Sequence, residues 1–209
     1  MPGTLHEAIS NSDLHGLKRL LDAGADVAQP DAAGVSPLML AVKQGNVPVV
    51  RLLLDYRGDP NTHDRAGMSL IMVAAAMKHV ELVKLLVQRG AQVDAANEEG
   101  NTALMIAARA GAQAVVQALL EAGADVNAAN RDGVTPLMQA ARLQQVAIIK
   151  QLIDAGAEPR ALDKYGRRAL IYAGEKGPPP AVIARLLGGK SEPTRPVKTA
   201  GARPWWKLW

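Results

Sequence analysis

The chain repeats a sequence pattern every 33 residues, and this period limits the folds open to it more than any other feature. Four independent ladders of similar residues keep that spacing. They are Gly34, Gly67, Gly100, Gly133 and Gly166; Leu38, Ile71, Leu104, Leu137 and Leu170; Ala41, Ala74, Ala107, Ala140 and Ala173; and Leu20, Leu53, Leu86, Leu119 and Leu152. Equivalent segments of this length form equivalent units, which stack along one axis and bury a core between neighbours.

Each unit predicts a turn followed by two short antiparallel helices. Residues 128–135 form a polar turn in which Gly133 can take a positive φ. Thr135 can cap the next helix, and Pro136 suits its first turn, where no N–H is needed. A second apolar helix then ends at Gly156. Because one unit cannot bury its apolar face alone, neighbours must stack on both sides.

The motif Gly-x-Thr-Pro-Leu, then Ala-Ala, then Leu-Leu-x-x-Gly-Ala-Asp-Val-Asn resembles the ankyrin repeat over residues 4–189. The resemblance implies an all-α ankyrin-repeat solenoid of stacked helix-turn-helix units with β-hairpin-like loops. It is specific for the fold and weakly specific for function.

We expect a repeat domain over residues 1–189. It divides into an N-terminal cap (1–30), four internal repeats (31–162) and a degraded C-terminal cap (163–189). A basic, Pro-rich tail (190–209) follows and ends in a Trp-rich segment.

Two departures from the pattern carry predictions. Arg57 stands where other units have the glycine that ends the second helix, and we expect Gly58 to take over by a one-residue shift. Methionines replace the histidine that the family places after Thr-Pro-Leu and that His6 retains. We interpret this Met ladder as core packing, with a deformable ligand groove as the alternative. It consists of Met39, Met72, Met105 and Met138.

The residues that chemistry needs are not grouped in this sequence. There is no Cys, the four His are not at metal-ligand spacing, and no phosphate loop or nucleophile motif is visible. We therefore expect no enzyme activity, no cofactor and no metal site; a small-molecule enzyme is the least supported of three hypotheses. The net charge of +4 equals that of residues 190–209, so the repeats do not predict nucleic-acid binding.

The N-terminus does not read as a signal peptide, and no apolar run approaches the roughly 18 residues of a membrane span. This predicts a cytoplasmic protein, or a periplasmic one if a leader has been removed. A composition rich in Ala, Arg and Leu and free of Phe and Cys hints at a bacterial source.

The resemblance implies that a protein partner binds the concave surface formed by the turn tips and first helices. Carried over by position, the candidate residues are Val35, Lys43, Arg65, Met68, Met77, Arg109, Val134, Arg142, Leu143, Lys164 and Arg167. Apolar side chains among cations indicate an acidic partner with apolar anchors; a merely solvated surface is the alternative.

The tail supplies three further candidates, Trp205, Trp206 and Trp209. Exposed Trp indicates a recognition element for a partner protein, a membrane surface or the chain's own groove; an idle tail is the alternative. Contact with a membrane through so short a segment would be weak.

Two functions from different classes fit these expectations. The first is a scaffold or adaptor, monomeric when alone, that holds a protein partner. The second is an inhibitor or immunity-type protein that occludes an enzyme or toxin.

Overall fold

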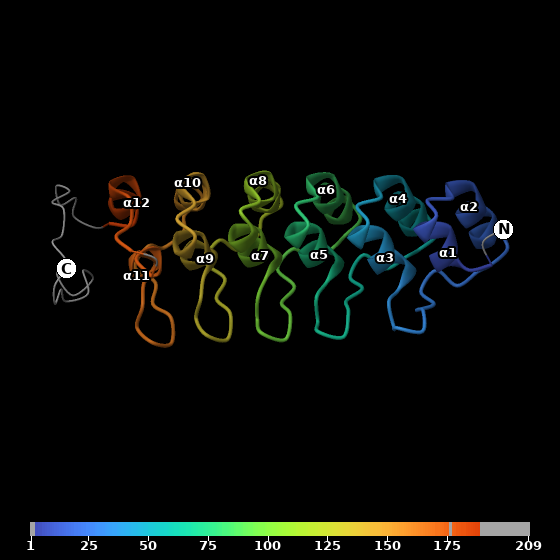
Figure 1. Ribbon diagram of the computed structural model, residues 1–209, viewed down its shortest axis with the longest axis horizontal. Coiled ribbons are helices and arrows are strands. Elements are labelled where there is room, and N and C mark those ends of the chain that lie inside the picture. The colour runs from blue at the N-terminus through green and yellow to red at the C-terminus, as the bar shows by residue number, and fades with distance from the viewer. Residues whose placement is uncertain (1–2, 176, 189–209) are drawn as a thin grey trace.

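The computed structural model describes residues 3–175 and 177–188, and twelve α-helices form within these ranges. Consecutive helices pair, and the pairs stack side by side, with odd-numbered helices in one row and even-numbered helices in another (Figure 1). This confirms the predicted all-α solenoid. The helices are α1 (Leu5–Ser10), α2 (Leu14–Asp22), α3 (Pro37–Lys43), α4 (Val47–Asp55), α5 (Leu70–Ala76), α6 (Val80–Gln88), α7 (Ala103–Ala110), α8 (Gln113–Glu121), α9 (Pro136–Arg142), α10 (Val146–Asp154), α11 (Ala169–Ala173) and α12 (Ala181–Leu186).

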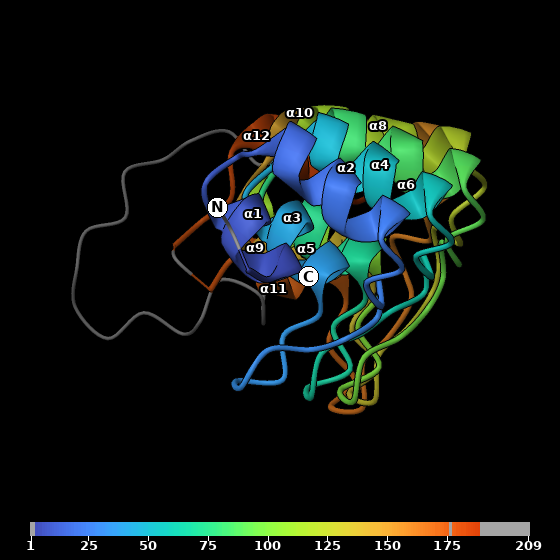
Figure 2. The same ribbon diagram turned by 90° about the vertical axis from the view of Figure 1, so that its right-hand side faces the viewer.

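Five long loops join each pair to the next, and they project from the helix rows on one side (Figure 2). We call them fingers and name each after the helix that follows it. They are the α3 finger (23–36), the α5 finger (56–69), the α7 finger (89–102), the α9 finger (122–135) and the α11 finger (155–168).

Side-chain caps fix where most odd-numbered helices begin. The Thr135 hydroxyl accepts the Met138 N–H at 3.4 Å, and Ser36 accepts the Met39 N–H at 3.2 Å. Ser69 occupies the same position before α5, but its buried hydroxyl lacks a hydrogen-bond partner. Five odd-numbered helices thus begin after Ser or Thr, a residue type that caps helices well. The Ser69 side chain before α5 is the one of these five that makes no capping hydrogen bond.

Small and flexible side chains fill the core between pairs. Ala41, Ala74, Ala107 and Ala140 are fully buried, which lets neighbouring odd helices approach closely. The four methionines of the Met ladder are also buried. This confirms the interpretation as core packing. His6 links the first pair to the second, because its Nε2 lies 2.8 Å from the Val35 carbonyl oxygen.

One helix end differs from its prediction. Gly58 does not take over the left-handed position after α4; Arg57 itself has a φ of 67°, so the prediction of a one-residue shift is wrong. The reason is the next hydrogen bond. The Gly58 N–H donates to the Leu53 carbonyl at 2.9 Å, as the Ala91 N–H donates to Leu86. Keeping this bond in register outweighs the roughly 1–2 kcal/mol cost of a left-handed non-glycine residue.

Side chains on the fingers also hold neighbouring units together. The Asn127 carboxamide accepts the Glu158 N–H at 2.9 Å and donates to the Gly156 carbonyl at 3.1 Å. Asn61 makes the equivalent contacts with Gln92 and Gly90. None of the helices within the described ranges is long and apolar enough to cross a bilayer.

Candidate functional site

The odd-numbered helices and the fingers share one face of the stack, which we call the concave face. A shallow hollow of about 280 Å³ shows that both contribute to it. Its lining includes Val35 at the base of the α3 finger, Lys43 at the end of α3, and Arg65 at the tip of the next finger. The second and third units therefore both contribute to the surface at this point.

Carboxylate and amide side chains shape every finger. In each one an Oδ1 atom accepts the N–H groups two and four residues later at 2.8–3.0 Å. These side chains are Asp31, Asp64, Asn97, Asn130 and Asp163. They set the direction of the tip residues, yet they escaped prediction. Their 33-residue spacing and shared Asp or Asn identity were the signal.

Three predicted cations lie on the first part of the concave face. Lys43, Arg65 and Arg109 are all exposed. The Arg65 guanidinium lies against Gly34 of the preceding finger. Within residues 3–175 and 177–188, none of the three forms an ion pair. Their charges are therefore available to a partner.

The three predicted cations of the last two helix pairs form ion pairs with acidic side chains. The Arg142 Nε atom lies 2.9 Å from Glu175 Oε2, and Lys164 pairs with Asp132 across neighbouring fingers. Arg167 bonds to Asp163 at 2.8 Å and lies 3.6 Å from Glu175. This part of the face satisfies most of its own charge.

Asp163 forms a buried polar network at the base of the α11 finger. Its Oδ2 accepts the Arg167 Nε–H at 2.8 Å and the Tyr172 hydroxyl at 2.7 Å. Burial raises the pKa of Asp163, but hydrogen bonds from Arg167 and Tyr172 lower it more, to about 2. Burial and the bond to Asp163 raise the pKa of Tyr172 to about 12. Over the physiological pH range Asp163 therefore stays ionised and Tyr172 stays neutral. Since neither group gains or loses a proton there, the network is structural.

The predicted apolar residues differ in what they offer a partner. Met77 is 52% exposed, and Leu143 is also exposed, so both project from the ends of odd helices. Val35 and Met68 are half-buried. Val134 is only 9% exposed and belongs to the core, which leaves little of it for contact.

The remaining predicted residues, Trp205, Trp206 and Trp209, lie outside the described residues. In the part of the chain that is described, no three His, Asp or Glu side chains gather as metal ligands. What the concave face offers is a row of exposed cations and apolar side chains on rigid supports, an arrangement suited to binding.

A family model described as "Ankyrin repeats (3 copies)" matches the chain three times, over residues 5–97, 57–130 and 123–195. A search of curated proteins finds no match. The three matches together span most of the sequence and coincide with the stacked helix pairs and fingers. Ankyrin repeats generally mediate protein–protein interactions. The chain belongs to the ankyrin repeat family.

Proposed function

We propose that this protein is a scaffold or adaptor that holds a partner protein against its concave face. The observation that carries the proposal is the group of unpaired cations, Lys43, Arg65 and Arg109, beside exposed or half-buried apolar side chains. Exposed cations with no internal acid lose little on meeting a carboxylate, because no existing ion pair must break.

The partner is an acidic protein segment with apolar anchors. Val35 lines the same hollow as Lys43 and Arg65, and Met77 offers a further exposed apolar side chain at the end of α5. Arginine and apolar groups together form the usual energetic centres of interfaces. The Trp-rich end of residues 190–209 provides a second contact to the same partner.

An inhibitor or immunity-type protein would use the same rigid face to occlude an enzyme or toxin. The two functions differ in what happens to the partner. An inhibitor blocks the partner's activity in a purified assay, whereas an adaptor binds the partner and leaves that activity intact.

The test is affinity capture from the source cell with quantitative mass spectrometry. The baits are the full chain, a chain lacking residues 204–209, and a charge-reversed chain carrying K43E, R65E and R109E. We expect a partner that is captured by the full chain, weakened by the deletion and lost by the charge reversal. A partner captured equally by all three baits would reject the concave face as its binding site. Assaying the purified partner then separates adaptor from inhibitor.

A further inference from the structure

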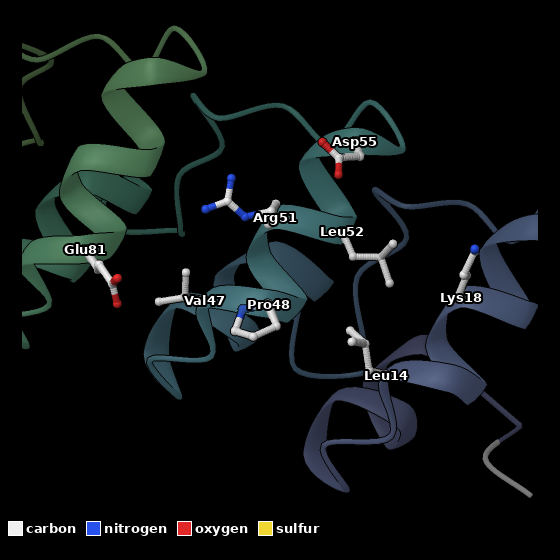
Figure 3. A pocket seen from close by; sticks show the side chains of 8 residues that line it. All are labelled: Leu14, Lys18, Val47, Pro48, Arg51, Leu52, Asp55 and Glu81. Carbon is white, nitrogen blue, oxygen red and sulfur yellow. The ribbon is translucent and has the colours of Figure 1, made fainter.

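A second hollow lies on the opposite side of the stack, on the outer surface of the even-numbered helices. It has a volume of about 560 Å³ and spans α2, α4 and the start of α6 (Figure 3). Its lining residues are Leu14, Lys18, Val47, Pro48, Arg51, Leu52, Asp55 and Glu81. None of these residues belongs to the concave face.

The floor of this hollow is apolar at a place where a solvated helix surface is normally polar. Leu14 is 43% exposed at the start of α2, although it is a large aliphatic side chain. Val47, Pro48 and Leu52 continue the apolar surface from α4 (Figure 3). A continuous apolar patch with a charged rim is the usual mark of a binding site.

Later units treat the equivalent surface differently. Gln113 replaces Leu14 at the start of α8, three periods along the chain. Between α8 and α10 the Gln151 Nε2–H donates to the Gln117 Oε1 at 3.0 Å, so amides bridge the neighbouring helices. The position of Leu14 stays apolar as Val146 in α10, but Gln151 and Ala147 replace Leu52 and Pro48 there, so the apolar floor of the hollow is not repeated between α8 and α10.

The charges around the hollow are unevenly satisfied. Asp55 pairs with Arg89 at 2.8 Å, which leaves its charge compensated. Lys18 and Arg51 are exposed, and neither forms an ion pair with any residue that the structure describes. The other acidic lining residue, Glu81, lies at the far end of the hollow, in the first turn of α6 (Figure 3). The free charge beside the apolar floor is thus positive, with one negative point at its edge.

We propose that this hollow binds a second protein segment, which places an apolar side chain on Leu14, Val47 and Leu52 and carboxylates against Lys18 and Arg51. Charge complementarity selects this occupant. The chain's own residues 190–209 carry five cations and one acid, so they would meet Lys18 and Arg51 with the same sign. Glu81 adds specificity, because a partner with an acidic residue at that end is repelled.

Two binding faces on opposite sides let one copy hold two proteins at once, which is the requirement for a scaffold. The second face does not depend on the first. A test of the outer hollow is therefore independent of a test of the concave face, because the two surfaces share no residue.

The experiment selects 16-residue peptides from a phage-displayed library on the full chain and measures the affinity of each synthetic peptide by fluorescence anisotropy. Peptides for the outer hollow should carry an apolar residue flanked by Asp or Glu. Their affinity should fall at least about tenfold in L14R and in the pair K18E and R51E. It should stay unchanged in the concave-face variant with K43E, R65E and R109E.

The chain provides matched controls at the same repeat positions. Val146 is 37% exposed at the start of α10 and corresponds to Leu14, while Lys84 and Lys150 correspond to Lys18 and Arg51. Because Lys84 lies one turn from Glu81, which lines the hollow, the controls are V146R and K150E, and both should leave the affinity within about twofold of wild type. Circular dichroism of L14R, whose changed side chain replaces a partly exposed leucine, checks that the variant folds.

Three results would overturn the proposal. One is a set of selected peptides that all bind L14R and V146R equally. Another is tighter peptide binding when residues 190–209 are deleted, since the tail would then be the occupant. The third is a dimer in sedimentation equilibrium that L14R abolishes, which would assign the hollow to a second copy.

Discussion

Of the predicted cations on the concave face, three lie in pairs 2 to 4 and three in pairs 5 and 6, but only the second group is paired with acids within the described residues. For the two arginines at the ends of odd helices, the residue one period further along explains the difference. Arg109 is followed 33 residues later by Arg142, a like charge, whereas Arg142 is followed by Glu175. At this position an arginine is paired where the next repeat places an acid beside it. Lys43, Arg65 and Arg109 thus have no acid of the described residues to neutralise them, whereas Arg142, Lys164 and Arg167 form ion pairs within the last two helix pairs.

The largest effect that we expect on the comparison between early and late helix pairs comes from substituting Asp163. D163N keeps an oxygen for the backbone N–H groups but loses the charge that holds Arg167 and Tyr172, so we expect a loss of about 2–4 kcal/mol in unfolding free energy. The measurement is urea unfolding followed by circular dichroism.

The matched control is D64N, at the same position in the α5 finger. Asn97 and Asn130 already fill this role, so D64N should cost less than about 0.5 kcal/mol. Equal losses in the two variants would contradict a special role for the last pair.

Acid should weaken the last pair before the early ones. The pKa of Asp163 is lowered to about 2 in the folded chain from an ordinary value of 3.8, so its contribution is complete above pH 5 and is lost as the pH falls through 4 toward 2. Hydrogen exchange followed by mass spectrometry should show α11 and α12 losing protection first. In D163N this difference between pH 5 and pH 3 should shrink.

A smaller effect should distinguish the helix cap Ser69, in the early part of the stack, from the helix cap Thr135, in the late part. T135A should destabilise the protein by about 1 kcal/mol, because the Thr135 hydroxyl accepts the Met138 N–H. S69A should change stability by less than about 0.3 kcal/mol or increase it, because the buried Ser69 hydroxyl has no partner to lose. Thermal unfolding of both variants checks the order, and a larger loss in S69A would show that Ser69 does cap α5.

The smallest effect is that of the Arg142–Glu175 pair. Both side chains are partly exposed, so their coupling in a double-mutant cycle of R142A and E175A should be about 0.5 kcal/mol. A coupling near zero would mean that Arg142 is as free as Arg109, and the two halves of the face would then be alike.

The period predicted most of the fold, because the four ladders of Gly, Leu or Ile, and Ala positions define both the helix pair and its stacking. It predicted the core position of the Met ladder for the same reason. The ion pairs of Lys164 and Arg167 could not be predicted from the period, since each depends on how a finger turn brings an acidic side chain close. The pair of Arg142 with Glu175 was not predicted either, although Glu175 stands one period after Arg142, because only the contact between the side chains shows that the two meet.

Local departures were harder to predict than the repeat itself. Arg57 was expected to yield its conformation to Gly58, because the intrinsic cost of a left-handed arginine was weighed without the downstream hydrogen bond to Leu53. The outer hollow at Leu14 could not be predicted from the period, because it depends on how side chains of α2, α4 and the start of α6 meet on the surface.

The most direct test of the central claim is the affinity of the captured partner for two charge-reversed chains. One carries K43E, R65E and R109E, and the other carries R142E and K164E. We predict a loss of about 100-fold or more for the first and less than about threefold for the second, because only the first set has charge free for a partner. Equal losses, or a greater loss in the second chain, would contradict the account.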